Sequence, residues 1–231
     1  MTNNKIFISF IGSRGSGKTT VADELAKSLC KLEKRVLRQH QGLSGGLSIR
    51  GLWNAITLWS YFDREIVSKI GFCGRPARRT PSLYRLYLPL AFSKDIFELG
   101  RRGDVLIYDS NFMRGMMQAF VQRELHITQV VDFYERKILS KLDQVLIVVI
   151  DTDPRLAIAR WMSRDNVNIA DEEIEKEIRS RQSLQFAIDT FVTNLAKSQK
   201  VKVIRLRGDE LPNNNVIQIL SSFDEFKSVS S

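Results

Sequence analysis

The sequence is poor in the side chains from which metal centres and disulfide frameworks are built. Its 231 residues include two cysteines, Cys30 and Cys73, and two histidines, His40 and His126. Two isolated cysteines give neither a metal-ligand spacing nor a disulfide framework, and the histidines do not form a ligand pair. We therefore expect a chain that folds in a reducing cytoplasm and buries both thiols as structural residues.

Long apolar runs and repeats are also missing. No segment reaches the roughly 18 consecutive apolar residues of a membrane span. The apolar run at residues 6–11 is too short for a secretory signal, and no small-residue cleavage site follows it. With 43% hydrophobic and 26% charged residues, the chain is typical of one large globular α/β domain, spanning 1–231.

Acidic residues are outnumbered, and the formal net charge is +9. Residues 75–102 hold seven basic and two acidic side chains, so this stretch alone carries +5. Such a patch suits an anionic partner, although a solvated basic surface gives the same pattern. Because no helix clusters base-reading residues beside phosphate contacts, we do not expect a nucleic-acid recognition module.

Five strand-like apolar runs alternate with helical segments. The runs fall at residues 5–11, 34–37, 105–108, 145–150 and 201–206, and most of them lack polar alternation. Apolar residues recur at helical spacing in the intervening segments 19–32 and 170–198. Strands without alternation are typical of a parallel sheet that is buried on both faces. We predict a P-loop NTPase fold, a three-layer αβα domain with helices on both faces of a five-stranded parallel sheet.

The interval 42–102 is the longest without a strand-like run. We expect a helical insertion there, folded over the carboxyl edge of the sheet on the acceptor side. Its aromatic helix at 52–69 can form a pocket wall or the surface of a homodimer. At the other end of the chain, the polar residues 221–231 are expected to form a flexible tail.

A glycine-rich loop follows the first predicted strand. Residues 12–19 match G-x-x-x-x-G-K-[ST] and lie between an apolar strand and an amphipathic helix. Glycines let backbone N–H groups converge on phosphate oxygens, and the positive end of the helix adds to the attraction. Lys18 would pair with the phosphates and the Thr19 hydroxyl would bind Mg²⁺. The loop predicts that ATP is bound by Gly12, Ser13, Arg14, Gly15, Ser16, Gly17, Lys18, Thr19 and Thr20.

A magnesium site in such a fold needs a second oxygen ligand from a neighbouring strand. Asp109 and Asp151 each end an apolar run. Asp151 precedes Thr152-Asp153-Pro154, which is typical of a helix start with Asp153 as N-cap and Pro154 at the first helical position. We therefore prefer Asp109 for the metal, although it can also be a turn residue.

Two arginines follow the fourth predicted strand. Arg160 and Arg164 are one helical turn apart, and the polar segment after them makes residues 160–170 a candidate lid. Cations that a lid brings over the γ-phosphate stabilise the charge of phosphoryl transfer. The alternative is a surface pair bonded to acids such as Asp165 or Glu172. Arg179 and Arg181 are weaker candidates, because acids on the same helix can neutralise them.

With these residues placed, the chain resembles the thymidylate kinase-like branch of the nucleoside monophosphate kinases over residues 5–206. Four segments carry the likeness: the phosphate loop at 12–20, the helix, glycine turn and strand at 98–109, Gln-Ala-Phe at 118–120, and the strand, Asp-Pro turn and arginines at 148–164. The resemblance implies a kinase that uses ATP and Mg²⁺, with catalytic roles for Lys18, Asp109, Arg160 and Arg164.

The sequence departs from that family where the acceptor is bound. The family's Asp-Arg pair is Asp109-Ser110 here, and the acid usual after the second strand is missing from residues 38–41. A lysine stands where the family has an arginine in the basic helix. The ATP half of the site therefore carries over better than the acceptor half. The residues that we expect at the acceptor are His40, Arg75, Arg85, Lys94, Arg114 and Gln118.

Two functions fit these features. The first is an ATP- and Mg²⁺-dependent kinase whose acceptor is a nucleotide or another phosphorylated metabolite, because a phosphorylated acceptor explains the basic stretch at 75–102. The second is a P-loop protein that hydrolyses or senses its nucleotide without transfer and binds an acidic partner. The net charge and the missing arginine favour this second function.

Arg114, five residues after Asp109, is the candidate replacement for the missing arginine. We expect Arg114→Ala to lower turnover, because the replaced side chain would hold the acceptor phosphate or assist transfer. The measurement is steady-state ADP release with a working acceptor. Unchanged turnover would rule out this role.

Overall fold

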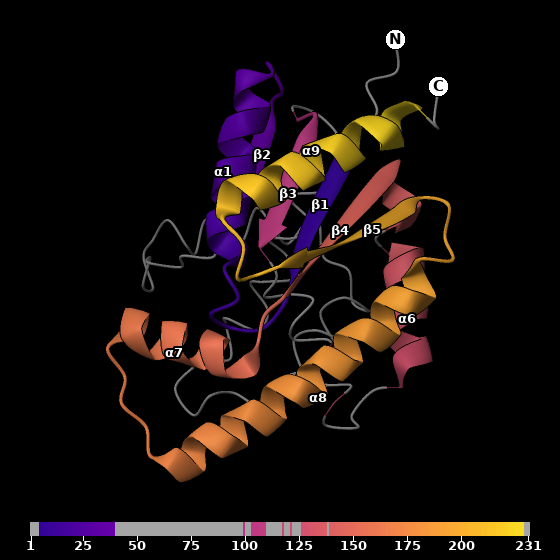
Figure 1. The fold of residues 1–231 in the computed structure, drawn as a ribbon. Helices are drawn as coiled ribbons and strands as arrows, with labels where there is room; N and C mark the ends of the chain where they lie inside the picture. The colour runs from indigo at the N-terminus through magenta and orange to yellow at the C-terminus, as the bar shows by residue number, and fades with distance from the viewer. Residues whose placement is uncertain are drawn as a thin grey trace, which may run out of the picture.

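The computed structural model describes residues 5–39, 103–109, 126–137 and 139–228, together with Leu99, Met117 and Val121. Five parallel strands form one sheet in the order β2-β3-β1-β4-β5 (Figure 1). The strands are β1 (Ile6–Ile11), β2 (Val36–Gln39), β3 (Val105–Asp109), β4 (Gln144–Asp151) and β5 (Val201–Arg207). The predicted five-stranded parallel sheet is confirmed, with β1 at its centre.

The register of the sheet brings the ends of β1 and β3 level with each other, beside β4, which continues to Asp151. Phe10 of β1 is level with Asp109 of β3 on one side and with Val148 of β4 on the other. In a parallel sheet the carboxyl ends of neighbouring strands meet at one edge, and ligands bind outside that edge. The loop that leaves β1 therefore begins between the ends of β3 and β4.

Helices cover both faces of the sheet. Helices α1 (Lys18–Lys31) and α9 (Pro212–Ser228) lie on one face, and α6 (Ile127–Lys137) and α8 (Asp171–Leu195) lie on the other (Figure 1). Along β1, Ile6, Ile8 and Phe10 pack toward the first pair. Phe7 and Ile11 pack toward the second pair. Because alternate residues serve two cores, the run is continuously apolar, as the three-layer prediction requires.

The helix after β4 begins where the sequence predicts. In α7 (Pro154–Asp165), the Asp153 carboxylate accepts from the backbone N–H groups of Arg155 and Leu156, at 2.9 and 3.1 Å. Pro154 occupies the start of the helix. These bonds satisfy two of the N–H groups that lack partners within the helix. The expected cap is therefore confirmed.

One further short element, a 3₁₀ turn (Leu139–Lys141), precedes β4.

Three local features differ from the sequence expectations. Cys30 is exposed rather than buried, because the buried side of α1 is formed by Val21, Ala22, Leu25 and Leu29. Helix α9 continues to Ser228, into the segment expected as a flexible tail, and Phe223 of this helix is buried. Helix α6 was not anticipated as an element. Cys73 lies outside the described residues.

None of the helices among the described residues is long and apolar enough to cross a membrane.

We predict that Asp153→Ala lowers the free energy of unfolding by about 1 kcal/mol, because two N–H groups at the start of α7 lose their acceptor. For a chain of this size the change corresponds to a fall of about 2–4 °C in Tm. Thermal unfolding of the wild-type protein, Asp153→Ala and Asp153→Asn measures it. Asparagine can still accept these bonds, so Asp153→Asn should resemble the wild type; equal losses in both variants would contradict the capping role.

Candidate functional site

The phosphate loop connects β1 to α1 at the carboxyl edge of the sheet. Gly17 is the N-cap of α1, with φ +92°, and no side-chain hydrogen bond caps this helix end. The first-turn N–H groups of a helix have no partners within the helix, so they are available to an anion at this position. The sequence expectation of a strand, glycine loop and helix in succession matches the observed elements.

Residues 13–16 form the tip of the loop. The Ser16 N–H donates to the Ser13 carbonyl at 3.3 Å, and Gly15 has φ +86°. A side chain is excluded at Gly15 for a second reason, because a Cβ there would lie 2.0 Å from the carbonyl oxygen of Ala157 in α7. The loop tip is thus a tight turn that lies directly against the helix following β4.

The Lys18 side chain folds back onto this turn and contacts both of its ends. Its Nζ donates to the Ser13 carbonyl at 2.5 Å and to Ser16 Oγ at 3.1 Å. The ammonium group therefore lies over the loop, where the sequence motif expects the nucleotide phosphates. Its role toward a nucleotide stays a prediction.

The expected pair of magnesium ligands is brought together. Thr19 Oγ1 at the start of α1 donates to Asp109 Oδ2 at the end of β3, at 2.6 Å. Arg38 of β2 adds a cation, with Nη2 lying 3.7 Å from the same carboxylate oxygen and Nε donating to Asp23 at 3.0 Å. Sequence reasoning did not single out Arg38. The available signal was a charged residue near the carboxyl end of a predicted strand, β2, which the structure places at the edge of the sheet.

Asp151, the alternative carboxylate, is engaged on the other side of the sheet edge. Its Oδ1 accepts from Gln185 Nε2 at 2.7 Å, and its Oδ2 lies 3.3 Å from Arg205 Nη1. Arg205 also pairs with Asp189 of α8 at 2.7 Å. Asp151 therefore ties β4 to β5 and α8, whereas Asp109 faces the phosphate loop.

The two predicted lid arginines have different partners. Arg160 Nη1 donates to the carbonyl of Gly208, after β5, at 2.6 Å. Arg164 Nε donates to Asp165 Oδ1 at 2.8 Å, which fits the surface-pair alternative for this residue. The Arg164 guanidinium lowers the pKa of Asp165 below its usual value, and the Arg14 charge and the Trp161 N–H act in the same direction.

A cluster of cations and one indole joins the loop tip to α7 and α8. Arg14 pairs with Asp165 and lies over the ring of Trp161, with its guanidinium carbon 5.0 Å from the ring centroid. Arg181 of α8 lies 5.7 Å from the same centroid, and its Nη1 donates to the Arg14 carbonyl. Trp161 Nε1 donates to Asp165 Oδ2 at 2.9 Å. Through these contacts, Trp161 and Asp165 of α7 and Arg181 of α8 hold the loop tip in place.

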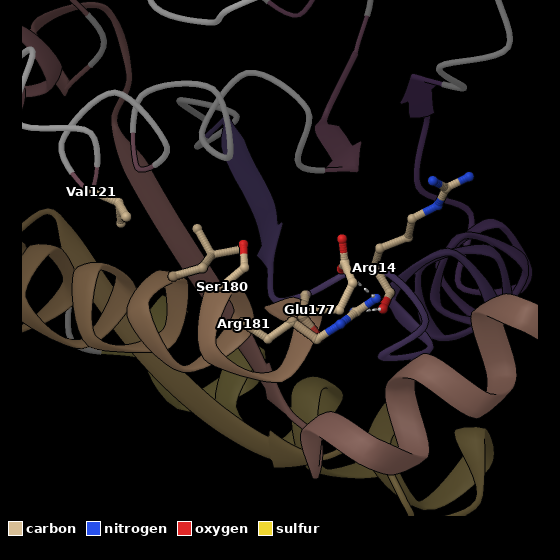
Figure 2. Close-up of a pocket in the computed structure, with 7 residues that line it drawn as sticks. Arg14, Val121, Glu177, Ser180 and Arg181 are labelled. Atoms are coloured by element: carbon tan, nitrogen blue, oxygen red, sulfur yellow. Dashed lines mark hydrogen bonds and ion pairs between the residues drawn. The ribbon is translucent and has the colours of Figure 1, made fainter. Parts of the chain in front are cut away.

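Figure 2 is a close-up of a pocket beside the loop. In this view the Arg181 side chain extends toward the backbone of Arg14, while the Arg14 side chain points away. Ser13, Ser180 and Leu184 also line the pocket. Arg181 is 6% exposed. From its position in the sequence Arg181 was only a weak candidate for a cation near the γ-phosphate, because helical periodicity does not reveal that the loop backbone lies against this side chain.

The residues expected at the acceptor lie outside the described part of the chain. These are His40, Arg75, Arg85, Lys94, Arg114 and Gln118. Ser110 and the insertion at 42–102, apart from Leu99, also lie outside it. Among the described residues no group of three His, Cys, Asp or Glu side chains forms a metal site. Mg²⁺ does not require such a group, because it commonly uses one or two protein ligands together with phosphates and water.

No protein-family model matches the chain, and no curated protein sequence matches it. Among solved structures, its fold is similar to thymidylate kinase from Ehrlichia chaffeensis, at 15% identity and a TM-score of 0.47, over 96% of this chain and 99% of that one. It is also similar to deoxyadenosine kinase from M. mycoides with bound dCTP, at 13% identity and a TM-score of 0.49, over 95% and 99% of the two chains. The same kinase with dCMP and dCDP bound gives 13% identity and a TM-score of 0.47, over 95% and 98%. At these values the similarities do not identify an activity.

We predict that Gly15→Ala destabilises the protein more than Gly17→Ala. Both positions have positive φ, which costs a non-glycine residue about 1–2 kcal/mol. Only at Gly15 does the new Cβ also collide with a backbone carbonyl, since nothing lies within 4 Å of the corresponding Cβ at Gly17. Urea unfolding without nucleotide measures the two free energies. Equal losses would show that the loop tip does not pack against α7 in solution.

Proposed function

We propose that this chain is a kinase that transfers the γ-phosphoryl group of ATP, with Mg²⁺, to a small anionic acceptor. The acceptor is a nucleotide or another phosphorylated metabolite. In the transfer, an acceptor oxygen forms a bond to the γ-phosphorus while the bond to the bridging oxygen of the β-phosphate breaks, so that ADP leaves. Such a reaction depends on positioning and on electrostatic stabilisation more than on covalent participation of the protein.

The observation that carries the proposal is the contact between Thr19 and Asp109. A hydroxyl from the phosphate-loop helix and a carboxylate from the adjacent strand meet at 2.6 Å, and both are the oxygen ligands that Mg²⁺ prefers. Thr19 and Asp109 would hold the metal, which when bound would neutralise charge on the phosphates. Arg38, 3.7 Å from the Asp109 carboxylate, supplies a further positive charge at this edge.

The remaining donor-side roles follow from position. The loop N–H groups and Lys18 would bind the β- and γ-phosphates, and nucleotide phosphates would take over the Lys18 contacts to Ser13 and Ser16. Arg160 and Arg164 lie on the helix beside the loop, and movement of residues 160–170 would bring them toward the transferred group. Their present partners, the Gly208 carbonyl and Asp165, would then have to be released.

The assignment of residues to the acceptor side is based on the sequence alone. Seven basic residues in 75–102 match an anionic acceptor, and Arg114 remains the candidate for the arginine that Ser110 replaces. The helical insertion at 42–102, a homodimer through 52–69 and a cytoplasmic location stay predictions. Activity toward dTMP does not follow from the residues present, because the Asp-Arg pair is incomplete.

The second candidate is a P-loop protein that hydrolyses or senses its nucleotide without transfer. Asp109-Ser110 in place of an Asp-Arg pair favours it, because the arginine is the part of that pair expected to serve the acceptor. The net charge of +9 would then serve a macromolecular acidic partner.

An acceptor screen tests the proposal. The purified chain is incubated with ATP and Mg²⁺ and with nucleosides, nucleotides, sugars or sugar phosphates, and ADP release is measured. We expect release to depend on one class of phosphorylated acceptor and to require Mg²⁺. ADP release that is independent of every acceptor would contradict the kinase and favour the second candidate.

Two variants define the signal. Lys18→Ala should abolish ADP release, since the loop loses its phosphate-binding ammonium group. Asp109→Asn should raise the Mg²⁺ concentration needed for half-maximal release, because a neutral amide binds Mg²⁺ more weakly than a carboxylate. Activity that persists in Lys18→Ala would point to a contaminating enzyme.

A further inference from the structure

The middle peptide of the phosphate-loop tip, between Arg14 and Gly15, has two possible orientations. Residues 13–16 form a turn closed by the 3.3 Å bond from Ser16 N to the Ser13 carbonyl. Gly15 has φ +86°, whereas Arg14 is not among the non-glycine residues with positive φ. These values are those of a type II turn. The type I alternative differs by a rotation of the middle peptide, with changes of about 150–170° in the two torsion angles beside it.

Arg181 contacts the oxygen of that peptide. Its Nη1 donates to the Arg14 carbonyl, and its Nη2 lies 3.6 Å from Glu177 Oε2, one helical turn earlier (Figure 2). The ring of Trp161 lies beside the guanidinium, with its centroid 5.7 Å from the guanidinium carbon of Arg181. A side chain with a permanent charge and 6% exposure is costly to bury, so its position has to be held by such contacts.

A planar trans peptide places its C=O and N–H in opposite directions. When the Arg14 carbonyl points to Arg181, the Gly15 N–H therefore points away from α8. Glycine at position 15 tolerates both turn types, so the loop sequence alone does not select this orientation. A donor outside the loop selects it by stabilising one position of the carbonyl.

We propose that Arg181 is a positioning residue that fixes the Arg14–Gly15 peptide with its N–H directed at the nucleotide phosphates. This inference rests on the proposed nucleotide-binding function and adds a residue to it from α8. Arg181 itself does not touch the phosphate; it acts through one backbone donor. Glu177 and Trp161 hold its guanidinium in place, and the Ala157 carbonyl of α7 occupies the space that a side chain at Gly15 would need.

The experiment measures the Kd of ADP and of tripolyphosphate, at low and at high ionic strength, for four proteins. Arg181→Met keeps the bulk of the side chain and removes its donors. Arg181→Lys keeps a cationic donor. Lys176→Met removes one positive charge from an exposed position on the same helix. Thermal unfolding without ligand reports whether each variant is folded.

We expect Arg181→Met to raise both Kd values about tenfold, the loss of one hydrogen bond to a charged group. Arg181→Lys should recover most of the affinity, and Lys176→Met should bind as the wild type does. Because the Gly15 N–H would be displaced, the tenfold ratio should persist at high salt. A ratio that shrinks to one at high salt would instead reveal a through-space effect of charge and would overturn the inference.

The other outcomes are also decisive. If Arg181→Met binds both ligands as tightly as the wild type, the positioning role is wrong while the proposed function stands. If Arg181→Met weakens ADP but not tripolyphosphate, the residue acts on the nucleoside side, which also contradicts the inference. A wild-type protein that binds neither ligand contradicts the proposed function and this inference together, whereas binding without any acceptor-dependent turnover contradicts the kinase alone.

Discussion

The burial of β1 on both faces is the constraint on which the site depends. This strand lies between β3 and β4, and its alternate side chains enter the two separate cores. It cannot shift by one residue without exchanging those sets of side chains. The starting point of the phosphate loop is therefore fixed against the end of β3, and the short contact between Thr19 and Asp109 follows from that register.

The loop tip is held from outside the sheet as well. Helix α7 approaches Gly15 through the Ala157 carbonyl, and α8 reaches the Arg14 carbonyl through Arg181. Both helices follow β4, so residues far from the loop in sequence determine the shape of its turn. A glycine-rich motif supplies the freedom to adopt this turn, and the surrounding helices supply the choice among the conformations that it allows.

Sequence patterns were informative where one physical cause dominates. Continuous apolar runs predicted the parallel strands, and Asp153-Pro154 predicted the start of α7. Strand order was not predictable, because an apolar run does not encode its neighbour. β2 begins at Val36 rather than at residue 34, since the chain first leaves α1 through Glu33, with φ +58°, and Lys34 donates to the Leu29 carbonyl. Arg181 and Arg38 acquire their importance only from tertiary contacts, which periodicity does not report.

Asp165 serves three donors at once: the guanidinium groups of Arg14 and Arg164 and the indole N–H of Trp161. These contacts lower the pKa of its carboxyl group, with Arg164 the largest cause. A carboxyl group whose pKa is lowered in the folded protein contributes stability that is fully present above the pKa of the unfolded chain and is lost as the pH falls through the folded-state pKa. In the folded protein the Asp165 carboxylate at the junction of the phosphate loop and α7 therefore stays ionised, and stays paired with Arg14 and Arg164, at pH values where an ordinary aspartate has begun to take up protons.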